Sequence, residues 1–235
     1  MIGFLYSTSI SADQDNFVIA FRTIKENAKD AFDLIRLVLS SPRFAPEDIA
    51  RVKQQMVGGL EQRLHLPQPI GKETLQGLVL GENHPYSKRI SDRIRKIPEI
   101  TVEQLQSYMK SSFTQNRMRI VVVGNIGEDD LLAQVNALIQ QQPKGDRLPL
   151  FMVTPFRGPG KMHAITMDVP QSFVLFAHPG VSRHDPDFYA FFVANSILGG
   201  STFESRLWKE VREKRGLAYG IGQPQRQKPF TRRLI

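Results

Sequence analysis

The side chains with the widest chemical range in this 235-residue chain are five histidines. They are His65, His84, His163, His178 and His184. Two histidines four positions apart on a helix share one face and can hold a zinc ion that activates water. No two histidines here have that spacing, and His178 and His184 are separated by Pro179-Gly180, which does not form a helical face. The isolated His65 and His84 are predicted to be surface or capping residues.

Two glycine-containing turns could suggest phosphate binding, but neither has the required pattern. Gly199-Gly200 lacks the Gly-Lys-Ser/Thr sequence that completes a phosphate-binding loop, so we interpret it as a flexible turn. Gly124-Asn125-Ile126-Gly127 lies between an expected strand and an expected helix, but it lacks the third glycine of a dinucleotide-binding turn. We interpret this second segment as a tight connection between a strand and a helix.

Composition and charge exclude several classes of protein. The chain contains no cysteine, which excludes disulfides, thiolate zinc sites and a cysteine nucleophile. No apolar run approaches the roughly 18 residues of a membrane span, and the first residues lack the basic segment and cleavage site of a secretory signal. These features leave both a periplasmic and a cytoplasmic location open.

The positive charge of the chain indicates a solvated surface rather than a nucleic-acid interface. The formal net charge is +8, but the basic residues are spread out except near Lys88-Arg89, Arg93, Arg95-Lys96 and the C-terminal tail. Aromatic residues and glycines do not alternate with these charges as they do in many nucleic-acid-binding surfaces. We therefore expect no nucleic-acid partner.

Residues 1–144 show strand and helix patterns typical of an α+β fold. Apolar spacing predicts strands at 3–10, 16–22 and 118–123, and helices at 26–39, 46–63, 71–80, 101–113 and 129–141. Thr101 and Gln104 form the pattern of a capping box at the start of one of these helices. The strand at 118–123 is expected to be buried because residues 120–123 form an apolar run.

A change in composition separates this region from the C-terminal part of the chain. Residues 145–160 are rich in proline and glycine, which is typical of a linker. Beyond it, the patterns predict paired strands at 161–169 and 173–177, helices at 187–198 and 203–214, and a strand from Leu217. Gly216 suits the position just after a helix end. The only tryptophan, Trp208, is interpreted as a core residue beside Leu207 and Val211.

The longest specific pattern in the chain runs from Leu198 to Tyr219. Its two blocks are Leu198-Gly199-Gly200-Ser201-Thr202-Phe203-Glu204-Ser205-Arg206-Leu207 and Val211-Arg212-Glu213-Lys214-Arg215-Gly216-Leu217-Ala218-Tyr219. This pattern resembles the C-terminal half of the pitrilysin/insulinase family of peptidases, which carry an inverted zinc motif. His84-Pro85-Tyr86, Ile100-Thr101 and the segment 119–126 follow the same family's order. The resemblance covers nearly the whole chain.

The resemblance implies two homologous metallopeptidase-like α/β sandwich domains, both incomplete in this chain. Residues 3–63 are similar to the succession that follows the Gly-Leu-x-Tyr strand of the family. The chain is therefore expected to begin at the point of one repeat at which it ends in the next repeat. We expect residues 1–144 to be the C-terminal part of the first domain and residues 145–160 to be a linker. Residues 161–235 would then be the N-terminal part of the second domain, whose sheet would be short of strands.

The resemblance also defines a metal site that these residues do not supply. Active relatives bind zinc through His-x-x-Glu-His on a helix and a downstream glutamate. Alignment on Ile49–Lys53 places the downstream ligand near Gly59, which has no donor atom. Glu61 lies about 200° further around the helix. We therefore expect no zinc, no other cofactor and no peptide hydrolysis by this chain alone, as in a non-catalytic paralogue.

Arg212 and Tyr219 are the residues for which the resemblance implies a role. In the family, an arginine and a tyrosine seven positions later reach the substrate near the zinc ion. A guanidinium can hold a peptide carbonyl or carboxylate, and a phenolic hydroxyl can donate to an oxyanion. Without that context, Arg212 would be a helix-surface residue and Tyr219 a half-buried strand residue.

Two functions follow as alternatives. The first is a non-catalytic subunit that contributes Arg212 and Tyr219 to peptide hydrolysis by a zinc-bearing paralogous subunit in a heterodimer. The second is a structural or binding module of the same fold, or a truncated remnant without function. The substrate and the identity of the partner are not specified by the sequence.

Overall fold

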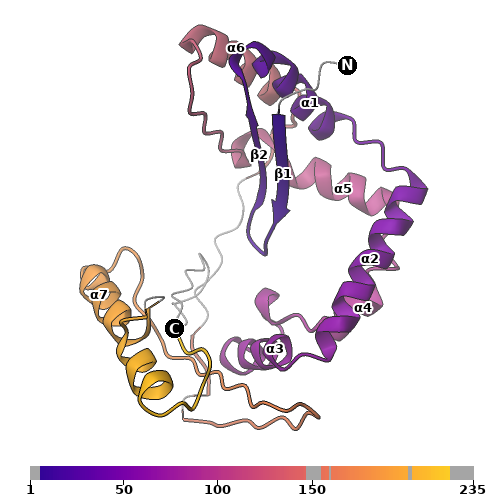
Figure 1. The fold of residues 1–235 in the computed structure, drawn as a ribbon. Helices are drawn as coiled ribbons and strands as arrows, with labels where there is room; N and C mark the ends of the chain where they lie inside the picture. Colours follow the sequence, from indigo (N-terminus) through magenta and orange to yellow (C-terminus); the bar gives the residue numbers. More distant parts are fainter. Residues whose placement is uncertain (1–5, 147–154, 159, 201–202, 223–235) are drawn as a thin grey trace. The chain divides into compact units, whose positions relative to one another are not determined.

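The computed structural model describes residues 6–146, 155–158, 160–200 and 203–222 (Figure 1). Its elements are mainly helical, and β1 (Tyr6–Ala12) and β2 (Phe17–Thr23) form the one sheet assigned in these residues. The chain divides into two compact units, Met1–Val57 with Arg95–Pro149, and Gly58–Ile94 with Leu150–Ile235. This arrangement confirms a mixed α and β composition that is rich in helix.

β1 and β2 form an antiparallel hairpin in the first unit. The register pairs Tyr6 with Thr23 and Ala12 with Phe17. Asp13 fixes the turn because its side chain accepts hydrogen bonds from the backbone N–H groups of Asp15 and Asn16, at 2.6 and 2.8 Å. The two strands predicted at this end of the chain are confirmed, and the end of the first strand and both bounds of the second lie within two residues of the prediction. The predicted start at residue 3 lies outside the described residues.

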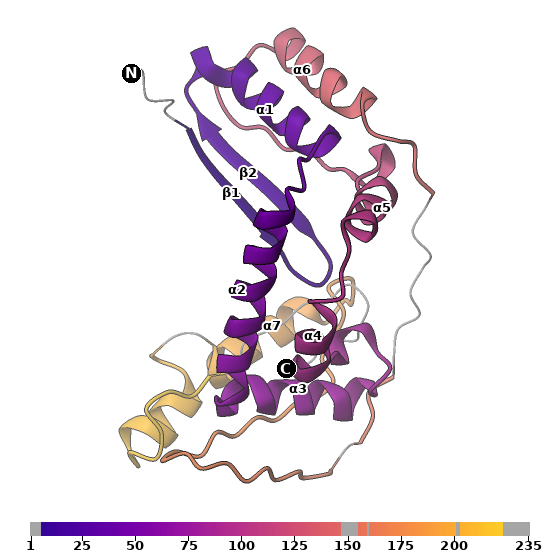
Figure 2. The ribbon, with the colours of Figure 1, turned by 90° about the vertical axis from the view of Figure 1, so that its right-hand side faces the viewer.

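The core of the first unit lies between α1 (Ala28–Ser40), α6 (Glu128–Gln140) and the hairpin. α1 and α6 lie side by side (Figure 2). Their buried side chains are Phe32, Ile35, Leu39 and Leu138. Phe21 of β2 packs edge-on against Phe32, with ring centroids 5.3 Å apart. The apolar spacing that predicted these two helices therefore corresponds to the faces that the structure buries.

Two further helices begin with local signals that the sequence contains. Thr101 and Gln104 form the predicted capping box at the start of α5 (Val102–Ser112), since each side chain accepts a hydrogen bond from the other residue's backbone N–H. Pro46 is the first residue of α2 (Pro46–Leu64), where its missing N–H costs nothing. α2 passes from the first unit into the second.

The second unit contains a smaller core around α3 (Pro67–Leu80) and η2 (Pro85–Ser87), and it is followed along the chain by α4 (Ile90–Lys96). Its buried residues are Val79, Leu80 and Tyr86, and Phe156 and Ala177 pack against them. The Nδ1 atom of His84 accepts a 3.1 Å hydrogen bond from the backbone N–H of Tyr86. This contact confirms the prediction that His84 is a capping residue.

The remaining assigned elements of the second unit are α7 (Phe188–Gly199) and the π-helical turn η4 (Trp208–Glu213). α7 confirms the helix predicted at 187–198. Several of its apolar side chains are exposed, among them Tyr189, Val193 and Ile197. η4 is shorter than the helix predicted at 203–214. No helix in the described part of the chain is both long and apolar enough to cross a membrane.

Four of the predicted strands are not present in the structure. The segments are 118–123, 161–169, 173–177 and the strand from Leu217, and none is assigned as a strand in the structure. The expected burial is also wrong, because Val121 and Val123 are 86% and 94% exposed. A strand requires hydrogen bonds from a neighbouring strand, and among the described residues only β1 and β2 pair in this way.

The first unit also contains the short 3₁₀ turns η1 (Lys25–Asn27) and η3 (Gln115–Arg117). η3 ties the end of α5 to the segment after α6. The backbone N–H of Gln115 donates to the Pro143 carbonyl at 3.0 Å, and the Arg117 guanidinium donates to the Asp146 carbonyl at 3.1 Å. These bonds hold together two segments that lie almost thirty residues apart in sequence.

Candidate functional site

The helical turn that carries Arg212 is wider than an α-helical turn. The backbone N–H of Lys214 donates to the Lys209 carbonyl at 3.0 Å, which is the i to i+5 pattern of a π-helix. The turn is anchored at its start by Ser205, which is 1% exposed. The Ser205 hydroxyl accepts a bond from the backbone N–H of Trp208 at 3.4 Å. π turns are common at functional positions.

A left-handed glycine ends this turn and reverses the chain. Gly216 has φ of 60°, a conformation that costs other residues a steric penalty. Its N–H donates to the Arg212 carbonyl, and the N–H of Leu217 donates to the Val211 carbonyl, both at 3.0 Å. The predicted position of Gly216 just beyond a helix end is confirmed. The reversal leads the following residues back toward Arg212.

The structure brings the two predicted site residues together and adds a third. The Cζ atom of Arg212 lies 4.8 Å from the ring centroid of Tyr219 and 4.0 Å from the ring centroid of Trp208. Both separations lie within the range of a cation–π interaction. Tyr219 is 88% exposed and is not the half-buried strand residue of the alternative interpretation. Arg212 is half-buried.

Trp208 is not buried in the core as the sequence suggested. It is half-buried and contacts Phe203 edge-on, with ring centroids 4.8 Å apart. The interpretation of Trp208 as a core residue considered its apolar neighbours and not Arg212. The spacing of four between Trp208 and Arg212 is the sequence signal that identifies a neighbour on the same helical face. We name Trp208, Arg212 and Tyr219 the aromatic–arginine stack.

The charges around the stack leave the edge of the Arg212 guanidinium without an acidic partner. Hydrogen bonding by Lys209 lowers the pKa of Glu204, and hydrogen bonding by Lys214 lowers the pKa of Glu210. These two lysine contacts are both 2.6 Å long. Within the described residues, the Arg212 side chain forms neither a hydrogen bond nor an ion pair. Its N–H donors are therefore free to bind an oxygen of a ligand.

The residues at the family's zinc positions do not fit a zinc ion. Gly59 lies in α2 and supplies no ligand atom, and a Cβ added there would meet nothing within 4 Å. Glu61 is exposed on the same helix. In the part of the chain that the structure describes, no three His, Cys, Asp or Glu side chains gather where they could hold a metal.

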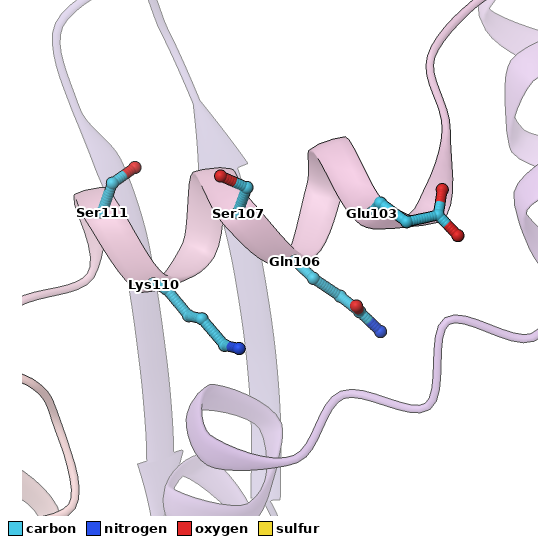
Figure 3. Close-up of a pocket in the computed structure, with 5 residues that line it drawn as sticks. All are labelled: Glu103, Gln106, Ser107, Lys110 and Ser111. Carbon is cyan, nitrogen blue, oxygen red and sulfur yellow. The ribbon is translucent and has the colours of Figure 1, made fainter.

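A shallow hollow on α5 is a weaker candidate. Its lining residues are Glu103, Gln106, Ser107, Lys110 and Ser111. Figure 3 shows that all five project from one helix and do not converge on a common point. Hydrogen bonding with the Thr101 side chain lowers the pKa of Glu103, which fits its place in the first turn of the helix. We assign no function to this surface.

Comparison with a protein family gives a match that covers more than half of the chain. The family is described as "Peptidase M16 inactive domain", and its model matches residues 99–226. The matched region includes all three residues of the aromatic–arginine stack.

Curated relatives are similar to this chain over most of its length. An uncharacterized zinc protease of Mycobacterium tuberculosis is 27% identical over 197 residues, which are 81% of this chain and 44% of that protein. A protein of Helicobacter pylori named a non-peptidase homolog is 25% identical over 218 residues, which are 92% of this chain and 49% of that protein. The chain thus spans about half the length of these relatives.

Solved structures share the fold. The crystal structure of a peptidase M16 inactive domain from Pseudomonas fluorescens is similar with a TM-score of 0.81 and 27% identity, over 99% of this chain and 56% of that chain. A protease from Helicobacter pylori has a TM-score of 0.68 at 16% identity, over 98% of this chain and 56% of that chain. The second likeness is one of fold alone.

Proposed function

Because this chain belongs to the peptidase M16 inactive-domain family, we propose that it binds peptide substrates for a zinc-bearing paralogous subunit. That membership confirms the pitrilysin/insulinase resemblance, and the family description calls the matched domain inactive. The proposal adds a role for Arg212 and Tyr219, and a heterodimer in which the partner supplies the zinc ion.

The observation that carries the proposal is the free edge of the Arg212 guanidinium. Trp208 and Tyr219 lie 4.0 and 4.8 Å from its carbon. Aromatic rings are therefore near the guanidinium, while its in-plane N–H donors have no partner among the residues that the structure describes. Such an edge can donate two parallel hydrogen bonds to a carboxylate, or single bonds to a peptide carbonyl. The exposed Tyr219 hydroxyl can donate to an oxygen that becomes negative during hydrolysis.

The chemistry of the partner and that of this chain are separate in this proposal. A zinc ion held by the partner would activate the attacking water. Arg212 would hold the substrate backbone, and Tyr219 would stabilise the developing oxyanion. Neither residue of this chain needs to take a proton from the water that the zinc ion would bind.

We also infer that residues 1–144 and 161–235 belong to two homologous α/β sandwich domains connected by residues 145–160. The exposed apolar side chains at 120–123 and 173–176 support this inference, because their spacing suits strands within a larger sheet. Additional strands beside them would satisfy their backbone and cover their side chains. The homologous domains are defined by repetition, whereas the two compact units are defined by contacts.

Reconstitution with a paralogue that carries His-x-x-Glu-His tests the proposed function. Cleavage of a fluorogenic peptide is expected only when both chains are present. Arg212→Ala should lower kcat/KM by about ten- to a hundredfold, which is the effect of losing a charged hydrogen bond. Arg206→Ala, which alters a neighbouring exposed arginine, is the matched control and should have no effect. Full activity of the Arg212→Ala complex would contradict the proposal.

A binding module without a role in hydrolysis is the second candidate, and the exposed apolar surface of α7 favours it. Tyr189 and Ile197 are 77% and 57% exposed on that helix, and such surfaces are typical of interaction sites. The similar protein of Helicobacter pylori is named a non-peptidase homolog. The second candidate would be supported if this chain binds the paralogue stably and the peptidase activity of the paralogue is the same with and without this chain.

A further inference from the structure

We infer that Trp208 is a positioning residue that holds the Arg212 guanidinium in the orientation for binding a peptide oxygen. The inference rests on the proposed function of Arg212 and assigns a role to a residue outside the Arg212–Tyr219 pair. The ligand group is an oxygen acceptor of a peptide, either a backbone carbonyl or a terminal carboxylate.

The position of Trp208 on the turn explains the short distance to Arg212. Residues four apart on an α-helix are offset by about 40° around the axis. In the π turn, residues four apart also stay on one face, so the two side chains are neighbours. The Arg212 Cζ atom lies 4.0 Å from the Trp208 ring centroid, closer than the 4.8 Å that separate it from the Tyr219 ring centroid.

The Trp208 ring is itself held in place. Phe203 contacts it edge-on at 4.8 Å, and the Ser205 hydroxyl accepts a hydrogen bond from its backbone N–H. Ser205 is almost completely buried. Tyr219, by contrast, is exposed and follows the glycine turn. Trp208 is therefore the more firmly supported of the two rings that contact Arg212.

A long arginine side chain has many rotamers in water, and binding a ligand must select one of them. An aromatic ring over the guanidinium makes that selection in advance and leaves the N–H edge available. Trp208 lies outside the two buried clusters of the described residues. A role in orienting Arg212 accounts for a large aromatic side chain at this half-buried position better than core packing does.

The first test uses the fact that Trp208 is the only tryptophan of the chain. Acrylamide quenching of its fluorescence measures access to the ring. Arg212→Ala should raise the quenching constant because the guanidinium no longer covers the ring, whereas Arg206→Ala should leave it at the wild-type value. Equal quenching constants in Arg212→Ala and Arg206→Ala would show that Arg212 does not cover the Trp208 ring and would overturn the inference.

The second test measures the role of Trp208 in the reconstituted heterodimer. Trp208→Leu should raise KM for a fluorogenic peptide by roughly two- to thirtyfold, which corresponds to loss of one cation–π contact. Trp208→Phe keeps an aromatic face and should restore most of the affinity. The two acceptors are separated by comparing a C-terminally amidated peptide with the same peptide that has a free carboxylate. If the terminal carboxylate is the acceptor, Trp208→Leu should raise KM only for the free peptide, and if a backbone carbonyl is the acceptor, KM should rise equally for both.

The double variant distinguishes positioning from a structural role. If Trp208 acts through Arg212, Trp208→Leu should have no further effect in an Arg212→Ala background. An effect of the same size in both backgrounds would overturn the inference and leave the proposed function intact. Wild-type activity of Arg212→Ala would overturn the proposed function itself, and the positioning role with it.

Discussion

The guanidinium carbon of Arg212 lies 4.8 Å from the ring centroid of Tyr219, and the left-handed Gly216 stands between them in the chain. A glycine adopts this backbone conformation without the penalty that a Cβ brings. The approach of Tyr219 to Arg212 therefore depends on one residue that contacts neither ring.

Replacement of Gly216 by alanine should loosen the aromatic–arginine stack. The left-handed conformation costs alanine about 1–2 kcal/mol, so the local turn should be destabilised by that amount in denaturation followed by Trp208 fluorescence. Gly220→Ala is the matched control, because its Cβ would meet nothing within 4 Å and its φ is not in the left-handed region. Equal effects of the two substitutions would contradict the role of the turn.

Leu138→Ala should destabilise the first unit by about 2–5 kcal/mol, because it opens a cavity between α1 and α6. Leu138 is 4% exposed, whereas Leu132 on the same helix is 50% exposed. Leu132→Ala should therefore change the free energy of unfolding by less than about 1 kcal/mol. Urea denaturation followed by circular dichroism measures both, and similar losses would place the core elsewhere.

His84 should make the second unit less stable at acidic pH. Burial lowers the pKa of His84 below its ordinary value of 6.5, and its Nδ1 must be unprotonated to accept the bond from Tyr86. The unfolded chain thus binds the proton more readily. The stabilisation is complete above pH 6.5 and is lost as the pH falls from there through the lower pKa of the folded state.

His84→Asn isolates this effect, because asparagine keeps a capping acceptor but does not titrate. The free energy of unfolding should fall more steeply for the wild type than for the variant between about pH 7 and pH 5. His84→Ala removes the acceptor and should cost about 1 kcal/mol at pH 8. Parallel pH profiles for the wild type and His84→Asn would refute the assignment.

Gly59→Glu should not create a zinc site, although it restores a carboxylate at the family's third-ligand position. A single glutamate without a histidine pair cannot hold the ion. The substitution should instead stabilise α2 by about 0.5 kcal/mol, because glutamate favours helix more than glycine does. Metal analysis of the purified variant and its melting temperature test both parts, with Gly59→Ala as the control for helix propensity. Stoichiometric zinc would disprove the first expectation.

Hydrogen exchange should be fast in residues 161–176 and slow in α1 and α6. The first segment has no assigned strand or helix, and many of its side chains are exposed, including Met162 and Val174. Amides without internal hydrogen bonds exchange readily. Addition of the paralogue should slow exchange at 161–176 if the partner supplies neighbouring strands. Strong protection in the isolated chain would contradict this expectation.

The helices of this protein were predictable from sequence because their signals are local. The spacing of Phe32, Ile35 and Leu39 predicts α1, and Thr101 with Gln104 predicts the start of α5. The strand predicted at 118–123 is not present in the structure, because a strand depends on a neighbouring strand that the segment itself does not encode. α4 was not predicted, and its seven residues give little periodicity to detect.

The site was predictable in part for the same reason. A long ordered motif identified Arg212 and Tyr219, and the structure places them in contact. The prediction that Trp208 is a core residue is wrong, because its ring lies against Arg212 and Phe203 and is only half-buried. The π turn depends on hydrogen bonds between residues five apart, and no residue type in Trp208–Glu213 specifies that pattern.

The π turn also makes the length of this segment as important as its composition. Deleting one residue between Trp208 and Glu213 would remove the extra residue that a π turn holds, and the backbone could return to α-helical bonding. Homologous chains that keep this geometry should therefore differ here by substitution and not by insertion or deletion. Constancy of spacing, more than identity of side chains, is the evolutionary signature that this turn imposes.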